Sequence, residues 1–221
     1  MTLSTIKIET AANPTVAVIW MHGLGADGND FVPIIRELDL TGCPAIRFVF
    51  PNAPHIPVSV NGGYVMPAWY DIRSADLLNR EDETGLHTSQ KSIEELIEIE
   101  RSSGVEQIVL AGFSQGCAMT LQTGLRHPQK LAGLMCLSGY LPLHQSVAPE
   151  RSAANQDVPI FMAHGRADPV VPMQRALQSR DLLRNLGYQI EWHEYDMPHS
   201  VCQEEIVDIG AWLRRVLKES N

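Results

Sequence analysis

The 221-residue chain lacks the features that mark nucleic-acid-binding and membrane-spanning proteins. It carries 26 acidic and 17 basic side chains, a formal charge of −9, and contains no basic cluster that could follow a phosphate backbone. No run approaches the roughly 18 apolar residues that a transmembrane helix needs, and the first ten residues lack the apolar core of a signal peptide. We therefore expect no nucleic-acid partner and no transmembrane segment.

Cysteine is also scarce, with four residues spread along the chain. They form no C-x-x-C pair and have no metal-ligand spacing, and most lie in apolar surroundings. This pattern predicts buried free thiols, no bound metal and a reduced, cytoplasmic setting. The four residues are Cys43, Cys117, Cys136 and Cys202.

What the chain does have is an alternation of apolar, β-branched runs with stretches of helical period. This alternation predicts an α/β fold with a mostly parallel central sheet flanked by helices on both faces. With 44% hydrophobic residues, the chain can bury one core, so residues 1–221 are expected to form a single domain. The expected strands are Thr15–Trp20, Ala45–Phe50, Gln107–Ala111, Leu131–Leu137, Val158–Ala163 and Gln189–Tyr195. The expected helices are Phe31–Leu38, Ser89–Arg101, Gln115–Arg126, Pro172–Leu186 and Val201–Leu217.

Local signals mark several helix boundaries. Pro172 suits the first position of a helix, and Gly187 suits the position just after one. Ser200 with Gln203 resembles a capping box at the start of the last helix. The exception to the regular alternation is the segment from Pro51 to Leu86, residues 51–86, which is rich in Pro, Gly and Asn. Long irregular segments in compact domains are usually functional, so this one is expected to cover the substrate.

The most informative motif is Gly112–Gly116, which places Ser114 between two glycines directly after an apolar run. This is the G-x-S-x-G pattern, in which a strand ends in a sharp turn and a helix begins beside an exposed serine. Glycines two residues before and after the serine remove side chains that would collide with the backbone. The pattern predicts a nucleophilic serine.

A serine nucleophile needs a base and a group that orients the base. His199 follows the last expected strand and directly precedes the last helix, whereas His193 lies inside that strand. Asp168 follows the preceding strand, and Asp196 is a nearer rival that could simply form the turn before Pro198. The order Ser114, Asp168, His199 matches that of the α/β-hydrolase arrangement.

Acyl transfer also needs two donors for the oxyanion. The backbone N–H of Gln115, directly after the serine, is the first candidate. Leu24 is the second, because it lies after the first expected strand between Gly23 and Gly25, where backbone can approach a substrate closely. A nucleotide-binding loop is improbable there, since no P-loop lysine follows and the match to G-x-G-x-x-G is imperfect.

These motifs together resemble the serine carboxylesterase and acyl-protein thioesterase family, the phospholipase/carboxylesterase group of small α/β-hydrolases. The resemblance runs over nearly the whole chain. It rests on Val18–Gly28, Arg47–Pro54, Asn61–Gly63, Ala68–Ile72, Ala111–Gly116, Leu137–Leu141, Asp168–Pro172 and Gly210–Trp212.

The resemblance implies Ser114 as nucleophile, Asp168 as orienting carboxylate and His199 as base. It also implies Leu24 and Gln115 as oxyanion donors and Trp69 beside the acyl-binding region, and it allows a homodimer. The chain departs from the pattern at Cys117, where similar sequences have a second glycine after the motif. A catalytic role for this cysteine is not expected, because a buried thiol is inert.

The sequence thus predicts a serine hydrolase that cleaves carboxylic esters through an acyl-enzyme, without a cofactor. The alternative is an acyl-protein thioesterase or lysophospholipase that acts on long acyl chains, with a lipidated protein or lysolipid as substrate. A more remote alternative is a non-catalytic relative that binds a ligand. The substrate is a small ester or acyl thioester, and the residues expected to contact it are Gly23, Met66, Trp69, Leu77 and Leu78.

Overall fold

The computed structural model describes residues 2–74 and 80–217, and its centre is a seven-stranded sheet with the order β1-β3-β2-β6-β7-β8-β9. All neighbouring strands are parallel except β1, which runs antiparallel to β3 at one edge. The strands are β1 (Thr5–Glu9), β2 (Val16–Met21), β3 (Ile46–Pro51), β6 (Gln107–Phe113), β7 (Gly133–Leu137), β8 (Ile160–Gly165) and β9 (Ile190–Tyr195). The mostly parallel sheet confirms the predicted fold class, and all six expected strands are present.

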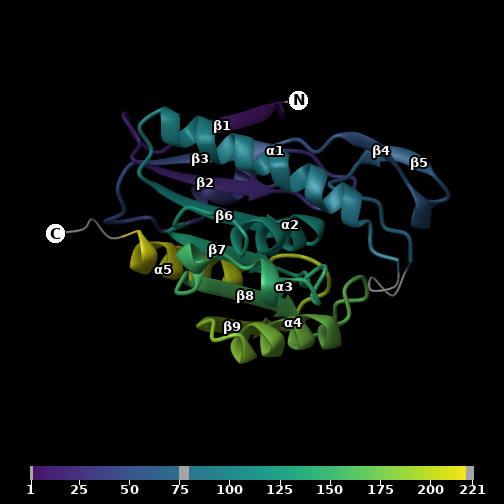
Figure 1. Ribbon diagram of the computed structural model, residues 1–221. Coiled ribbons are helices and arrows are strands. Elements are labelled where there is room, and N and C mark those ends of the chain that lie inside the picture. The colour runs from purple at the N-terminus through teal and green to yellow at the C-terminus, as the bar shows by residue number, and fades with distance from the viewer. Residues whose placement is uncertain (1, 75–79, 218–221) are drawn as a thin grey trace.

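Helices cover both faces of the sheet, as Figure 1 shows. One buried cluster joins the sheet to α1, α2 and α4, and a second cluster on the opposite face joins it to α5 and the short 3-10 helix η1. Because parallel strands are covered on both sides, their residues are buried throughout, as in β2 and β7. The α-helices are α1 (Glu83–Ser102), α2 (Gln115–Gly124), α3 (Val147–Glu150), α4 (Met173–Asn185) and α5 (Gln203–Val216).

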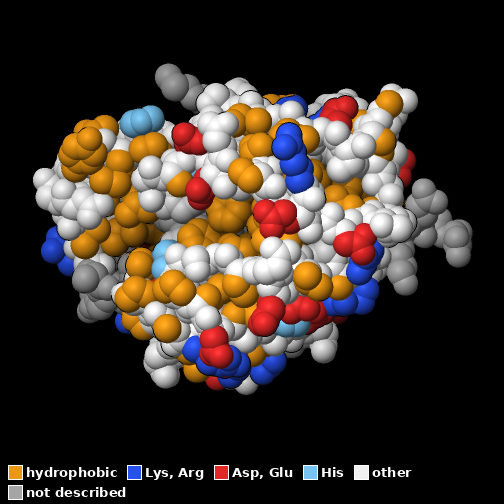
Figure 2. Space-filling model, turned by 180° about the vertical axis from the view of Figure 1, so that it is seen from behind, with side chains coloured by type: hydrophobic (Ala, Val, Ile, Leu, Met, Phe, Trp, Pro, Cys, Tyr) orange, Lys and Arg blue, Asp and Glu red, His pale blue; other side chains and the backbone are white. Residues whose placement is uncertain are grey.

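The expected irregular segment contains a small antiparallel hairpin, β4 (His55–Val58) with β5 (Tyr64–Pro67), joined through a 3-10 turn, η2 (Ser59–Asn61). It projects from the end of the molecule at which the parallel strands point their carboxyl ends (Figure 1). Val60, Tyr64 and Val65 are exposed on it, and apolar side chains gather at this end in the space-filling view (Figure 2). The whole hairpin was absent from the sequence prediction.

Three boundary predictions need correction. Residues 31–38 form only the short 3-10 helix η1 (Val32–Arg36), in which the N–H groups of Ile34 and Glu37 bond three residues back, to Phe31 and Ile34, rather than four. Pro172 is the N-cap of α4 rather than its first helical residue. The capping box of Ser200 and Gln203 is wrong, since α5 begins at Gln203 with Cys202 at its N-cap and no side-chain cap bond.

Other boundary signals hold. Gly187 has φ +92 directly after α4, which confirms the predicted helix-ending position. All four cysteines are free, Cys117 and Cys136 buried and Cys43 and Cys202 half-buried, so the expectation of full burial is correct for two of them. Within the described residues, no helix is long and apolar enough to cross a membrane.

Candidate active site

Ser114 lies at the sharp turn between β6 and α2. Its backbone has φ 56 and ψ −114, a conformation that side-chain-bearing residues rarely adopt. A Cβ on Gly112 would overlap the backbone of Gly116, and a Cβ on Gly116 would overlap the carbonyl group of Met21 at the end of β2. Both glycines of the motif are therefore required for the turn to close against the sheet.

His199 connects Ser114 to Asp168. Its Nε2 lies 2.9 Å from Ser114 Oγ, and its Nδ1 lies 2.7 Å from Asp168 Oδ2. Asp168 follows β8 and His199 follows β9, so the three groups meet at the carboxyl edge of the sheet. The three residues predicted from their order in the sequence are thus brought together in one hydrogen-bonded chain.

The carboxylate of Asp168 is fully buried and held from two sides. Its Oδ1 accepts hydrogen bonds from the backbone N–H groups of Val170 at 2.8 Å and Val171 at 2.9 Å. His164 Nε2 lies 2.8 Å from the carbonyl oxygen of Val171 and 3.5 Å from Asp168 Oδ2. Burial lowers the pKa of His164, so this imidazole is neutral at neutral pH and does not compete as a cation for the carboxylate of Asp168.

Asp196, the sequence rival of Asp168, is exposed and forms an ion pair with Arg166 at 2.8 Å. It makes no described contact with His199. The geometry therefore selects Asp168 as the partner of His199.

The glycine loop after β2 lies against the serine. A Cβ on Gly23 would stand 3.4 Å from Ser114 Cβ, which places the peptide between Gly23 and Leu24 beside the nucleophile. The N–H of Leu24 donates no hydrogen bond to any described residue. Gln115 is the first residue of α2, where a backbone N–H has no partner within the helix. Two N–H groups are therefore available on the two segments that meet at Ser114.

The side chain of Gln115 has a role that the sequence did not reveal. Its Oε1 accepts the backbone N–H of Trp69 at 2.8 Å, and its Nε2 donates to the carbonyl oxygen of Tyr70 at 2.7 Å. Ser89 of α1 donates a third bond to the carbonyl oxygen of Trp69. Since all these groups are buried, the segment before α1 is fixed to the turn that carries Ser114.

The residues predicted to contact the substrate differ in how deeply they are buried. Trp69 is 1% exposed, and its indole N–H donates to the carbonyl oxygen of His22 at 2.9 Å, so it packs below the glycine loop. Met66 is half-buried on β5, with its sulfur 3.8 Å from where a Cβ on Gly25 would lie. Leu77 and Leu78 lie outside the described residues.

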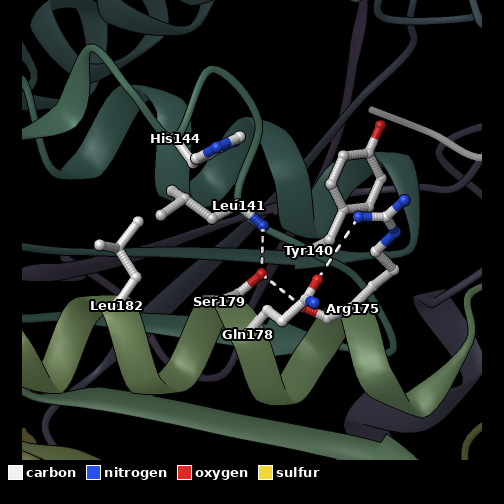
Figure 3. A pocket seen from close by; sticks show the side chains of 7 residues that line it. All are labelled: Tyr140, Leu141, His144, Arg175, Gln178, Ser179 and Leu182. Atoms are coloured by element: carbon white, nitrogen blue, oxygen red, sulfur yellow. Dashed lines mark hydrogen bonds between the residues drawn. The ribbon is translucent and has the colours of Figure 1, made fainter. Parts of the chain in front are cut away.

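A cavity of about 330 Å³ lies between the loop after β7 and helix α4. This volume is near the lower end of small-molecule pockets. Ser179 Oγ closes one side by accepting the N–H of Leu141 at 2.9 Å and donating to the carbonyl oxygen of Arg175 at 2.8 Å (Figure 3). The lining residues are Tyr140, Leu141, His144, Arg175, Gln178, Ser179 and Leu182.

Gly139, which precedes the cavity residue Tyr140, packs against the turn that carries Ser114. A Cβ on Gly139 would lie 2.8 Å from the carbonyl oxygen of Ser114 and 2.5 Å from Cβ and Sγ of Cys117. The thiol that departs from the family pattern thus fills the space next to a glycine on the neighbouring loop. Tyr140 was not predicted as a site residue, although its segment was one of the recognised motifs.

The comparisons with known proteins agree with this architecture. The family model for phospholipase/carboxylesterase matches residues 4–217. Acyl-protein thioesterase 1 of Cryptococcus neoformans is 38% identical over 98% of both chains. Acyl-protein thioesterase 1 of Neurospora crassa is 41% identical over 94% of this chain and 89% of its own.

Solved structures show the same fold. The crystal structure of Arabidopsis thaliana SOBER1 superposes with a TM-score of 0.86 at 29% identity, covering 92% of this chain and 99% of that one. Zea mays acyl-protein thioesterase 2 gives a TM-score of 0.86 at 26% identity, covering 97% and 99%. The fold is that of an α/β-hydrolase.

The chain belongs to the phospholipase/carboxylesterase family. It is an ester or thioester hydrolase, as the sequence predicted. The names of its relatives favour the thioesterase alternative over the general carboxylesterase that was the main prediction.

Proposed function

We propose that the protein is a thioesterase that removes long acyl groups from thioesters, through a Ser114–His199–Asp168 triad. The observation that carries the proposal is the hydrogen-bonded chain from Asp168 through His199 to Ser114, with separations of 2.7 and 2.9 Å. The choice of a thioester rests on the similarity of nearly the whole chain to the acyl-protein thioesterases of Cryptococcus neoformans, Neurospora crassa and Zea mays.

The proposed reaction has two steps. In the first, His199 Nε2 accepts the proton of Ser114 as its Oγ attacks the acyl carbonyl carbon, while Asp168 stabilises the imidazolium. The backbone N–H groups of Leu24 and Gln115 hold the oxyanion, and His199 then protonates the leaving thiol. In the second step, water activated by His199 attacks the acyl-enzyme, which releases the carboxylic acid and restores the serine.

The acyl chain needs an apolar surface close to Ser114. Tyr140, which lines the cavity, follows Gly139 on the loop that packs against the turn of Ser114, and Leu141 and Leu182 supply apolar lining. Gly23, Met66 and Trp69 remain proposed substrate contacts, with Trp69 beside the acyl-binding region and Met66 in its apolar lining. A lipidated protein or a lysolipid would present such a chain, and the free cysteines fit a reducing compartment such as the cytoplasm.

The test is hydrolysis of acyl-coenzyme A thioesters and p-nitrophenyl esters, each from acetyl to palmitoyl. We expect kcat/KM for the thioesters to rise with chain length and to exceed that for the matched esters at palmitoyl. Ser114→Ala should lose at least about 10³-fold in kcat and should not be labelled by a fluorophosphonate. A higher kcat/KM for short esters than for long thioesters would instead support the general carboxylesterase that the sequence predicted. Lack of both turnover and labelling in the wild type would favour a non-catalytic relative.

A further inference from the structure

His22, the residue that directly follows β2, has no role in the reaction steps above, yet its side chain is 1% exposed and fully engaged. Its Nε2 lies 3.0 Å from the backbone nitrogen of Ala53. Its Nδ1 lies 2.7 Å from the carbonyl oxygen of Gly23. The imidazole therefore bridges the loop after β3 and the glycine loop beside Ser114.

These two partners determine the protonation of the ring. The backbone nitrogen of Ala53 can only donate, so Nε2 of His22 must be the acceptor and Nδ1 must carry the proton. Burial lowers the pKa of His22, and the hydrogen bond to the backbone of Gly23 and the more distant carboxylates of Asp30 and Asp27 oppose this shift only in part. His22 is thus a neutral imidazole whose Nδ1–H donates to the carbonyl oxygen of Gly23.

That carbonyl belongs to the peptide group whose N–H is the proposed oxyanion donor, since the C=O of Gly23 and the N–H of Leu24 share one plane. In a trans peptide these two groups point in opposite directions, so a bond that fixes the carbonyl also fixes the N–H. The N–H of Ala26 donates to the same oxygen at 3.3 Å. Hydrogen bonds at the carbonyl end also polarise the peptide and make its N–H a stronger donor.

We propose that His22 is a positioning residue for catalysis, whose Nδ1–H···O bond to Gly23 aims the N–H of Leu24 at the oxyanion. The inference rests on the proposed function, because it needs Leu24 to act as an oxyanion donor. Trp69 supports the same loop from below through its bond to the carbonyl oxygen of His22, and its ring centroid lies 5.3 Å from the imidazole.

Two substitutions separate the two bonds of the imidazole. In His22→Asn, the amide Nδ2–H has the same reach from the backbone as Nδ1–H and keeps the bond to Gly23, while the contact with Ala53 is lost. In His22→Gln, the amide Oε1 reaches as far as Nε2 and keeps the contact with Ala53, while the bond to Gly23 is lost. Comparing the two variants therefore distinguishes orientation of the Gly23–Leu24 peptide group from general stabilisation of the fold.

The measurements are kcat and KM for palmitoyl-coenzyme A, corrected for active sites counted by fluorophosphonate titration, and the inhibition constant of an alkyl trifluoromethyl ketone. We expect His22→Gln to lose roughly 10- to 100-fold in kcat at unchanged KM, somewhat less than the loss of an oxyanion donor itself. The ketone forms a tetrahedral oxyanion on the serine, so its affinity should fall by the same factor. His22→Asn should stay within about threefold of the wild type in both quantities.

Equal kcat values for the two variants would overturn the proposal, as would a loss confined to KM or to the fraction of active sites. If His22→Gln does not fold, the test rests on His22→Asn. The proposal is overturned if His22→Asn folds but loses as much kcat as is expected for an enzyme without the oxyanion donor. Failure of the proposed function is a separate result, because it would appear in the wild type as lack of thioester turnover and of Ser114 labelling.

Discussion

At the scale of single residues, Ser114 combines a chemical role with an unfavourable backbone. A side-chain-bearing residue at φ 56 and ψ −114 costs on the order of 1–3 kcal/mol, and only glycine adopts this conformation readily. The surrounding structure maintains it, since the N–H of Ser114 donates to the carbonyl oxygen of Leu137 at 2.9 Å and its own carbonyl oxygen accepts from Ala118 at 3.2 Å. The turn that presents the proposed nucleophile is therefore formed at the expense of stability.

This strain predicts that Ser114→Gly is more stable than Ser114→Ala. Both variants remove the hydroxyl group and the reaction, but only glycine relieves the backbone. Relief of the strained backbone stabilises the glycine variant, and the larger backbone entropy that glycine loses on folding offsets part of this gain. We therefore expect its free energy of unfolding to exceed that of the alanine variant by about 1 kcal/mol. Urea denaturation followed by tryptophan fluorescence measures the difference. An alanine variant equal to or more stable than the glycine variant would show that the turn is unstrained.

Of the two carboxylate oxygens of Asp168, only Oδ2 is predicted to orient His199, because Oδ1 accepts the two backbone hydrogen bonds. In Asp168→Asn the amide can keep the two backbone bonds at one atom, but it then presents an NH₂ group to Nδ1–H of His199 and favours the wrong tautomer. The loss in kcat should be about 10⁴-fold. Asp196→Asn is the matched control: its carboxylate is exposed and paired with Arg166, so kcat should not change. Similar losses in the two variants, measured on the same thioester, would contradict the assignment.

At the scale of elements, helix α5 carries a buried carboxyl group in its first turn. Glu205 is 0% exposed, and burial raises its pKa to about 8, while the backbone N–H of Cys202 and the charge of Asp208 act in opposite directions. In the folded protein Glu205 therefore keeps its proton up to about pH 8, whereas in the unfolded chain it releases the proton near 4.5, the ordinary pKa of a glutamate side chain. Unfolding at neutral pH releases this proton, so this residue's effect on stability becomes more unfavourable as the pH rises from 4.5 to 8.

Glu205→Gln should remove that dependence. We expect the variant to gain up to about 3 kcal/mol in the free energy of unfolding at pH 7, and under about 1 kcal/mol at pH 5. Glu204→Gln, in the same turn but exposed, provides the control and should show no such pH-dependent gain. Chemical denaturation of the three proteins at both pH values gives the comparison. A gain that is equal at pH 5 and pH 7 would mean that Glu205 is ionised in the fold.

Most of the strands that sequence patterns predicted are buried on both faces of the sheet, although the half-buried edge strand β9 was also predicted. β2, β6, β7 and β8 are continuous apolar runs, which turn signals delimit well. β1 was missed because it is a half-exposed edge strand whose residues alternate with no long apolar run. The hairpin of β4 and β5 was missed because its prolines and glycines are typical of irregular chain, and its pairing depends on a partner strand rather than on composition.

At the scale of the whole molecule, the site is assembled from the ends of four parallel strands. The order of Ser114, Asp168 and His199 along the chain was enough to predict their meeting, because parallel strands end at one edge. The roles of His22 and His164, and the side-chain bonds of Gln115, could not be predicted in this way. They depend on which backbone groups face each ring or amide, and a sequence pattern carries no such information.

The packing of Cys117 against Gly139 constrains how this protein can change over evolutionary time. The two positions, on α2 and on the loop after β7, share one space that is large enough for a single small side chain. A Cβ at 139 would also lie 2.8 Å from the backbone carbonyl oxygen of Ser114, so reduction of Cys117 to glycine would not by itself make room for it. Position 139 is therefore restricted to glycine by the backbone of the serine turn, whereas position 117 accepts a small side chain only as long as residue 139 has none.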